Sequence, residues 1–112
     1  MKKQQLAETT TDPKVLDELS GAEELYVLWN VADNPNTSPE TLDYLSKNEY
    51  SSVRCGVALN PNTSPETLKR MAIVEDYSYI KDSIKDNPNC SLETYKYLSA
   101  LEIIMTLPQV ST

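Results

Sequence analysis

One nine-residue string occurs twice in this chain, letter for letter, and it constrains the fold more than any other feature. The string NPNTSPETL fills residues 34–42 and 60–68, and a third copy, NPNCSLETY, fills 87–95. A degenerate earlier copy, TDPKVL, lies at 11–16. A period of 26 to 27 residues is typical of stacked repeat folds. We therefore expect a single repeat domain, 1–112, in four units at about 8–33, 34–59, 60–86 and 87–112.

Equivalent positions in the copies predict two short helices in each unit. Two columns of apolar residues are three positions apart and two more are four positions apart, and both spacings place side chains on one helix face. The first two columns are Leu16, Leu42, Leu68 and Tyr95, then Leu19, Leu45, Met71 and Leu98. The other two are Val27, Val53 and Ile80, then Val31, Val57 and Ile84. Because one unit cannot bury these columns alone, the units must stack around a shared core.

The residues between the columns are typical of helix ends. Pro39 and Pro65 stand where a first helical turn begins, and Pro lacks only an amide that this turn leaves unpaired anyway. The residue before each helix can cap it, as Asp12, Ser38, Ser64 and Ser91. Alternatively, Thr37 with Glu40 and Thr63 with Glu66 form capping boxes one residue earlier. The Asn-Pro-Asn triplets at 34, 60 and 87 end the preceding helix, because the residue before Pro is extended.

The motif resembles the variant leucine-rich repeat family. The resemblance rests on NPNTSPETL, Leu45, Val53-Arg54 and Val57-Ala58-Leu59 before the next Asn60. It implies an all-α, right-handed α-solenoid in which each unit pairs an α-helix with a short α or 3₁₀ helix, without strands. It also implies a scaffold rather than an assigned activity. Some family members hold a cysteine-ligated iron–sulfur cluster ahead of the repeats, but no cysteine precedes Cys55 here, so the cluster is not implied.

Local packing is in question in the third unit. There IKDSIK at 80–85 replaces the Ala-rich segment of the family, and one residue is inserted.

Composition excludes most catalytic equipment. The chain has no His, so His-based acid–base catalysis and His metal ligation are absent. With only 2 Gly it lacks Gly-rich phosphate loops. The net charge of −7 disfavours a nucleic-acid-binding surface. We expect no enzyme activity, catalytic residues, cofactor or metal.

The compartment follows from the cysteines and from the apolar runs. Cys55 and Cys90 form no CxxC pair and predict free thiols rather than a disulfide framework. The N-terminus has basic residues but no apolar run behind them, and no stretch approaches the ~18 apolar residues of a membrane span. We expect a cytoplasmic protein without membrane contact.

Positions that differ between units are candidates for binding a partner. Trp29 aligns with Cys55 and Asp82, so its column does not demand a large apolar residue, and the indole either anchors a partner or closes the first unit's core. Tyr44 and Tyr97 share a solvent-facing column and are either contact residues or surface packing. Tyr95 lies in a core column and is assigned a structural role.

Acidic residues concentrate in the first half of the chain. Residues 1–51 carry 4 basic and 10 acidic side chains, against 6 and 7 in 52–112. Asp17, Glu18, Glu23 and Glu24 have no basic residue among them. They form either a docking face for a basic partner or a solvated face near helix starts.

The C-terminal segment 99–112 is apolar on more than one face around 101–107. Because solenoid ends need polar caps, this segment either folds back over the fourth unit as a cap or pairs with another chain in a homodimer.

Three functions are compatible with these features. The first is a non-enzymatic protein–protein interaction module on a small acidic solenoid. The second is an acidic inhibitor or nucleic-acid mimic that occupies a basic groove on a nucleic-acid enzyme. The third, an enzyme with an unrecognised carboxylate site, has the least support, because no motif accompanies the carboxylates.

Overall fold

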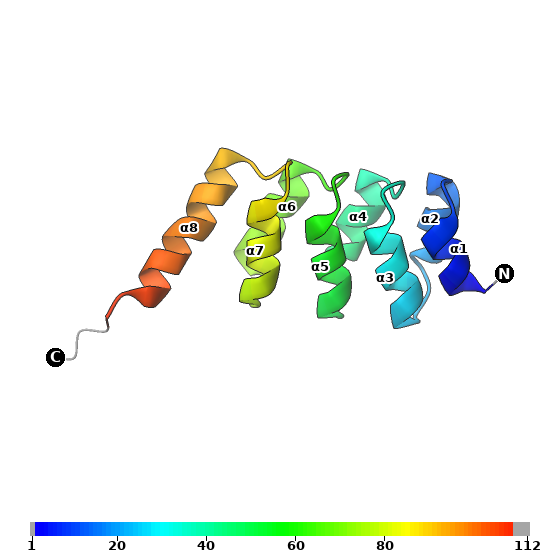
Figure 1. The fold of residues 1–112 in the computed structure, drawn as a ribbon, viewed down its shortest axis with the longest axis horizontal. Coiled ribbons are helices and arrows are strands. Elements are labelled where there is room, and N and C mark those ends of the chain that lie inside the picture. Colours follow the sequence, from blue (N-terminus) through cyan, green and yellow to red (C-terminus); the bar gives the residue numbers. More distant parts are fainter. Residues whose placement is uncertain (1, 109–112) are drawn as a thin grey trace.

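The structure is a computed structural model that describes residues 2–108, in which there are eight α-helices and no strand (Figure 1). The helices are α1 (Lys3–Thr9), α2 (Pro13–Leu19), α3 (Leu25–Asp33), α4 (Pro39–Leu45), α5 (Ser51–Leu59), α6 (Pro65–Val74), α7 (Ser78–Asp86) and α8 (Leu92–Thr106). They alternate between two rows, an odd row of α1, α3, α5 and α7 and an even row of α2, α4, α6 and α8. The molecule measures 61 × 25 × 16 Å, and its radius of gyration of 15.6 Å exceeds the roughly 13 Å of a compact domain of this length. The predicted all-α solenoid is confirmed.

Each even-row helix from α2 to α8 starts at a side-chain cap. The Asp12 carboxylate accepts a hydrogen bond from the amide of Lys14, and the Ser38 hydroxyl accepts one from the amide of Thr41. Ser64 and Ser91 cap α6 and α8 in the same way. The alternative capping box is therefore not used. Its Thr37 is instead fully buried, and its hydroxyl donates to the carbonyl of Val31 at 2.6 Å.

The Asn-Pro-Asn turns join successive units through buried amides. The Asn60 side chain donates from Nδ2 to the carbonyls of Ala32 (2.8 Å), near the end of α3, and of Asn34 (2.9 Å), in the preceding Asn-Pro-Asn turn. Its Oδ1 accepts the amide of Asn62 at 2.9 Å. The same three bonds recur one unit earlier and one unit later, and the side chains that make them are Asn34 and Asn87. We call this series the asparagine ladder.

The core lies between the rows and along the odd row. The predicted columns supply it: Leu42, Val53, Val57 and Leu68 are fully buried. Helices α3 and α5 approach so closely that a Cβ added at Gly56 would lie 2.9 Å from the Cβ of Ala32. Small residues at the odd-row contact thus set the distance between units.

The two ends of the chain differ from the prediction. Helix α1 begins before residue 8 and occupies a half unit ahead of the first one. In the fourth unit, a single continuous helix, α8, replaces the expected pair and tilts away from α7 (Figure 1). Within residues 2–108 α8 packs only on α6 and α7, and Tyr95 is 46% exposed rather than part of the core. Its ring lies under the Lys85 ammonium, 5.1 Å from the ring centre. The four-unit division otherwise stays a prediction.

Two further expectations from the sequence, on the helix type and on the packing of the third unit, can be compared with the structure. The short helices are all α-helices, and residues 2–108 contain none of the 3₁₀ helices that the resemblance implied. Helix α7 packs on α5 despite its unusual sequence, with Ile80 and Ile84 fully buried. Its polar residues are tolerated because no odd-row helix packs on its other side, and there Lys85 pairs with Glu102 at 2.9 Å.

Candidate functional site

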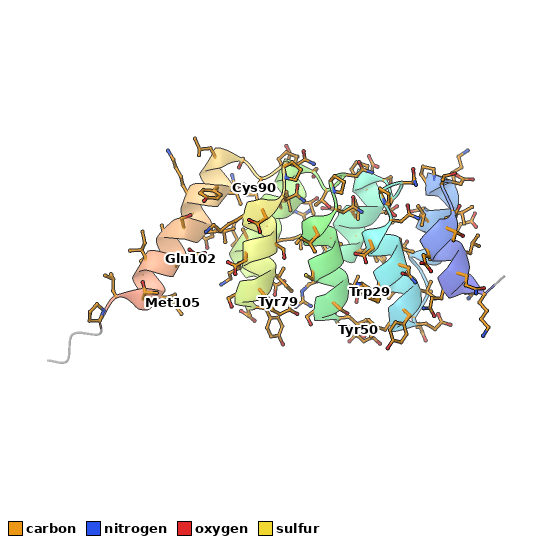
Figure 2. All side chains as sticks on the ribbon, viewed as in Figure 1. Trp29, Tyr50, Tyr79, Cys90, Glu102 and Met105 are labelled. Carbon is orange, nitrogen blue, oxygen red and sulfur yellow. The ribbon has the colours of Figure 1, made fainter. Side chains whose placement is uncertain are left out.

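A row of aromatic side chains follows the edge at which α3, α5 and α7 begin, and all of them except the partly buried Tyr50 are exposed. Figure 2 shows Trp29, Tyr50 and Tyr79 along this end of α3, α5 and α7. Tyr26 and Tyr77 come from the same helix starts. We call these five residues, with the acidic residues of the connecting segments before them, the acid–aromatic edge. The helices stack with their starts side by side, so residues that are far apart in sequence form one line.

The aromatic rings are accessible and pair with one another. Tyr26 is 58% exposed and Trp29 41%, with their ring centres 6.3 Å apart. Tyr77 and Tyr79 are about half exposed, with ring centres 5.6 Å apart. Trp29 therefore does not close the core, because a core indole would be enclosed. Aromatic rings that keep this much accessible area can supply anchors for a protein partner.

Carboxylates accompany the aromatic residues in each connecting segment. Glu23 and Glu24 precede α3, Glu49 precedes α5 and Asp76 precedes α7, and all four side chains are exposed. In the segments that connect α2 to α3, α4 to α5 and α6 to α7, the exposed basic residue is Lys47. The edge therefore combines negative potential with ring faces, and both attract Lys and Arg side chains.

An ion pair fixes the segment behind the edge. The Arg54 guanidinium donates to both carboxylate oxygens of Glu75, at 2.8 and 3.3 Å, and to the carbonyls of Asn48 and Glu49. It also lies over the Tyr77 ring, 5.9 Å from the ring centre. These partners hold the segments before α5 and α7 in a fixed position, so the aromatic residues project from a rigid base.

The electrostatics of this pair favour its charged form. Burial opposes ionisation of Glu75, but hydrogen bonds from Arg54 and from the amides of Tyr77 and Asp76 outweigh it, and the pKa of Glu75 lies below its usual value. The hydrogen bond with Glu75 raises the pKa of Arg54. Because Arg54 is fully engaged by its own chain, the adjoining groove of about 590 Å³, which Arg54 lines with Ser46 and Met71, gains no free cation from it.

The residues selected from the sequence divide between two surfaces. Glu23, Glu24 and Trp29 lie on the acid–aromatic edge. The others lie on the even row: Asp17, Glu18, Tyr44 and Tyr97. Asp17 and Glu18 belong to α2, whereas Glu23 and Glu24 belong to the segment between α2 and α3, and whether the four act as one docking face stays a prediction.

Some of the selected residues on the even row make contacts within the chain itself. The Asp17 carboxylate accepts the hydroxyl hydrogen of Thr41 at 2.8 Å, which ties α2 to α4, and Asp43 repeats this bond one unit later. Glu18 is exposed and lines a shallow groove with Asp17. Tyr44 is 62% exposed, and Tyr97 borders a small groove between α6 and α8.

Four aromatic residues of the edge were not selected from the sequence, and they are Tyr26, Tyr50, Tyr77 and Tyr79. The signal was an acidic residue shortly before a tyrosine at the starts of α3, α5 and α7: EELY at 23–26, EY at 49–50 and EDYSY at 75–79. It is visible only when the helix starts are aligned rather than the residue columns. Tyr26 and Tyr79 share one column, whereas Tyr50 and Tyr77 share another.

The described residues offer no arrangement typical of a metal centre. Within 2–108, no three acidic or cysteine side chains gather in a way that could hold a metal ion. Cys55 and Cys90 are free thiols, and burial raises the pKa of the Cys90 thiol. No helix in this part of the chain is long and apolar enough to cross a membrane.

The C-terminal segment does not fold back over the fourth unit in the described residues. The second half of α8 and the residue after it are exposed, with Ile103 at 63%, Met105 at 83% and Leu107 at 59%. Leu101 is the residue of this stretch that packs against the core. The choice between a cap and an interface for the segment 99–112 therefore stays a prediction, and 109–112 lie outside the described residues.

Comparison with known families gives a match for part of the second and third units. Residues 52–72, which run from α5 through the Asn60 turn into α6, match the family model described as leucine rich repeat variant. The match confirms the resemblance that the sequence motif indicated. No curated protein and no solved structure matches the chain.

Proposed function

We propose that this leucine-rich repeat variant protein is a non-enzymatic module that binds a protein partner along the acid–aromatic edge. The observation that carries the proposal is the line of aromatic rings at the starts of α3, α5 and α7, which are exposed at Tyr26, Trp29, Tyr77 and Tyr79 and partly buried at Tyr50. Large aromatic residues dominate binding energy at protein interfaces, and repeat proteins use surfaces that extend over several units. The Glu23, Glu24 and Trp29 of the sequence prediction belong to this surface.

The chemistry of the edge favours a basic partner segment. Exposed carboxylates at Glu23, Glu24, Glu49 and Asp76 attract positive charge, and the Tyr and Trp faces accept Arg or Lys by cation–π contact. The chain shows this contact internally, because its own Arg54 lies over Tyr77. An extended segment with Arg or Lys next to apolar residues would match the edge across three units.

Selection from a random peptide library displayed on phage, with the immobilised chain as bait, tests this proposal. We expect enriched sequences to be rich in Arg and Lys, and we expect Trp29→Ala to weaken their binding about tenfold or more. Tyr44→Ala is the matched control, because Tyr44 is as exposed as Tyr26 but lies on the even row. Enrichment of acidic or purely apolar peptides would contradict the proposal that the edge is the binding surface. A larger effect from Tyr44→Ala than from Trp29→Ala would also contradict it and would favour binding at the even-row residues Asp17, Glu18, Tyr44 and Tyr97.

The acidic inhibitor or nucleic-acid mimic stays an alternative proposal, and the net charge of −7 is what supports it. Heparin separates the two, because a polyanion displaces a mimic from a basic groove and displaces a partner held by aromatic anchors much less.

Two finer points complete the proposal. We place the module in the cytoplasm, which the free thiols of Cys55 and Cys90 support, since thiols stay reduced there. The C-terminal apolar segment acts as an interface with a second copy of the chain, and the exposure of Ile103 and Met105 supports this.

A further inference from the structure

A groove of about 590 Å³ lies beside the acid–aromatic edge, between the segment that joins α4 to α5 and the segment that joins α6 to α7. Residues 46–49 line it, together with the last turn of α6 and the two residues that follow. Glu49 and Asp76 of the edge are among its lining residues, and so is Arg54, which lies over the Tyr77 ring. The groove is therefore continuous with the edge, and its volume is within the roughly 300–1,000 Å³ of ligand pockets.

The length of α6 explains why there is room for this groove. Helix α4 has 7 residues and ends at Leu45, whereas α6 has 10 residues and continues past Met71, the equivalent of Leu45. The residues that follow differ, since SKN at 46–48 is replaced by AIV at 72–74. Ser and Asn bond to nearby backbone and favour helix ends, whereas Ala, Ile and Val have no side-chain group that competes with the helix. The last turn of α6 therefore passes beyond the end of α4, and its Val74 is 75% exposed.

Several polar groups that line the groove already have partners in the chain. The Arg54 guanidinium donates to Glu75 and to two backbone carbonyls of residues 46–49. The Glu75 carboxylate also accepts hydrogen bonds from the two backbone amides that follow it, and Arg70 pairs with Asp43. An apolar group that covers these side chains leaves none of them unpaired, so it does not incur the cost of a lost hydrogen bond.

The remaining charges of the groove are exposed and negative on balance. Lys47, Glu49 and Asp76 are exposed and make no ion pair within residues 2–108. Two carboxylates against one ammonium attract a basic residue, and the Tyr77 ring beside them accepts its charge by cation–π contact. Val74 supplies apolar surface at the same place. The groove thus matches an apolar side chain that has a basic residue beside it.

We propose that this groove binds one large apolar side chain, such as Leu, Ile, Met or Phe, of the basic partner segment, next to an Arg or Lys that contacts Glu49 and Asp76. The inference rests on the proposed function and names a second feature that the partner needs. The carboxylates and rings of the edge attract basic segments in general, whereas the groove distinguishes among them by the apolar residue. A segment that carries Arg and Lys alone binds the edge more weakly, because the groove stays empty.

Affinity measurements with a library-selected peptide and two neighbouring variants of α6 test the groove. We expect the selected peptides to carry a large apolar residue at a constant spacing from an Arg or Lys. Val74→Gln makes the groove more polar without a change of charge, and we expect it to weaken binding about fivefold or more. Ile73→Gln is the matched control, with an expected effect below about twofold, because Ile73 is 60% exposed on the same turn but lines the separate groove between α6 and α8. Both variants should keep the stability of the parent chain in urea, since both side chains are exposed.

Replacement of the peptide's apolar residue by alanine completes a double-mutant cycle. We expect this peptide to lose about tenfold in affinity for the parent chain and less than about twofold for Val74→Gln, because the contact is already absent there. Equal losses on both chains overturn the groove, and so do selected peptides without an apolar residue. Trp29→Ala separates this inference from the proposed function. If Trp29→Ala weakens binding and Val74→Gln does not, the edge stands and the groove is wrong, whereas a peptide that is insensitive to both variants contradicts the proposed function itself.

Discussion

Replacement of Asn60 by alanine removes one rung of the asparagine ladder and tests how the units are held together. Asn60 is 3% exposed, and its amide group makes three hydrogen bonds to backbone groups. Two of them cross to earlier parts of the repeat, at the carbonyls of Ala32 in α3 and of Asn34 in the preceding Asn-Pro-Asn turn. Alanine makes none of these bonds and leaves the Ala32 carbonyl and the Asn62 amide N–H without this partner, whereas the Asn34 carbonyl still accepts a hydrogen bond from the amide of Thr37.

The expected loss of stability follows from the bonds. A buried hydrogen bond contributes about 1 kcal/mol net, and a buried group left unpaired costs about 1–3 kcal/mol. Three bonds therefore give about 3 kcal/mol, and incomplete rescue by water raises the loss toward about 5 kcal/mol. Because a domain of this size has a free energy of unfolding of about 5–15 kcal/mol, the effect is a large fraction of the total.

Urea unfolding followed by far-UV circular dichroism measures this loss. The matched control is Asn36→Ala, because the Asn36 side chain makes one hydrogen bond, to the Asn34 side chain, and crosses no unit boundary. We expect the control to lose less than about 1 kcal/mol. A loss below about 1 kcal/mol for Asn60→Ala, or equal losses in both variants, would refute the view that these amides join the units.

Three further predictions concern packing, pH and the division between structure and binding. Gly56→Ala should destabilise the chain by about 1 kcal/mol in urea unfolding, because the contact 2.9 Å from the Ala32 Cβ outweighs the better helix propensity of alanine. Glu75→Gln should lower stability at neutral pH and flatten the acid limb of the pH–stability curve. The pKa of Glu75 is depressed in the folded state by Arg54, so its contribution is complete above the unfolded-state pKa of about 4.3 and is lost as the pH falls through the folded-state value. Asp17→Ala should cost about 1 kcal/mol of stability and leave the affinity for selected peptides unchanged.

Each of these variants has a control in the same chain. Gly21→Ala should be nearly neutral, because a Cβ there meets only a backbone oxygen at 3.6 Å. Glu66→Gln should leave the acid limb unchanged, since Glu66 makes no ion pair within residues 2–108. Glu18→Ala should leave stability unchanged, since Glu18 is exposed beside Asp17. If Gly21→Ala destabilises as much as Gly56→Ala, or if Glu66→Gln flattens the acid limb as Glu75→Gln does, the corresponding explanation is wrong.

The sequence predicted the helices well because the repeat supplies aligned copies of each position. Leu42 and Leu68 occupy one column and are both fully buried, and Ser38 caps α4 as its spacing indicated. Columns fail where a neighbouring unit is missing. Tyr95 aligns with these leucines, yet it is half exposed because α8 packs only on α6 and α7 within residues 2–108.

The candidate site was predicted only in part, for a physical reason. Trp29 was selected because its column varies, and the structure indeed leaves it partly exposed. Tyr50 and Tyr79 come from different columns, so the alignment did not group them, although the start of each helix brings them to the same edge (Figure 2). Asp17 was selected as a charge, whereas its bond to Thr41 depends on stacking that the pattern alone does not show.

The fluorescence of Trp29 tests binding at the acid–aromatic edge most directly, because this residue is the chain's single tryptophan and lies on that edge at 41% exposure. A library-selected peptide, free of tryptophan, is titrated into the chain while calorimetry records binding in parallel. Binding along the edge predicts a saturable shift of the emission to shorter wavelength, with the same midpoint as the calorimetric curve. In Tyr26→Ala we expect the peptide affinity to fall in both measurements. Calorimetric binding that leaves the Trp29 emission unchanged would contradict it.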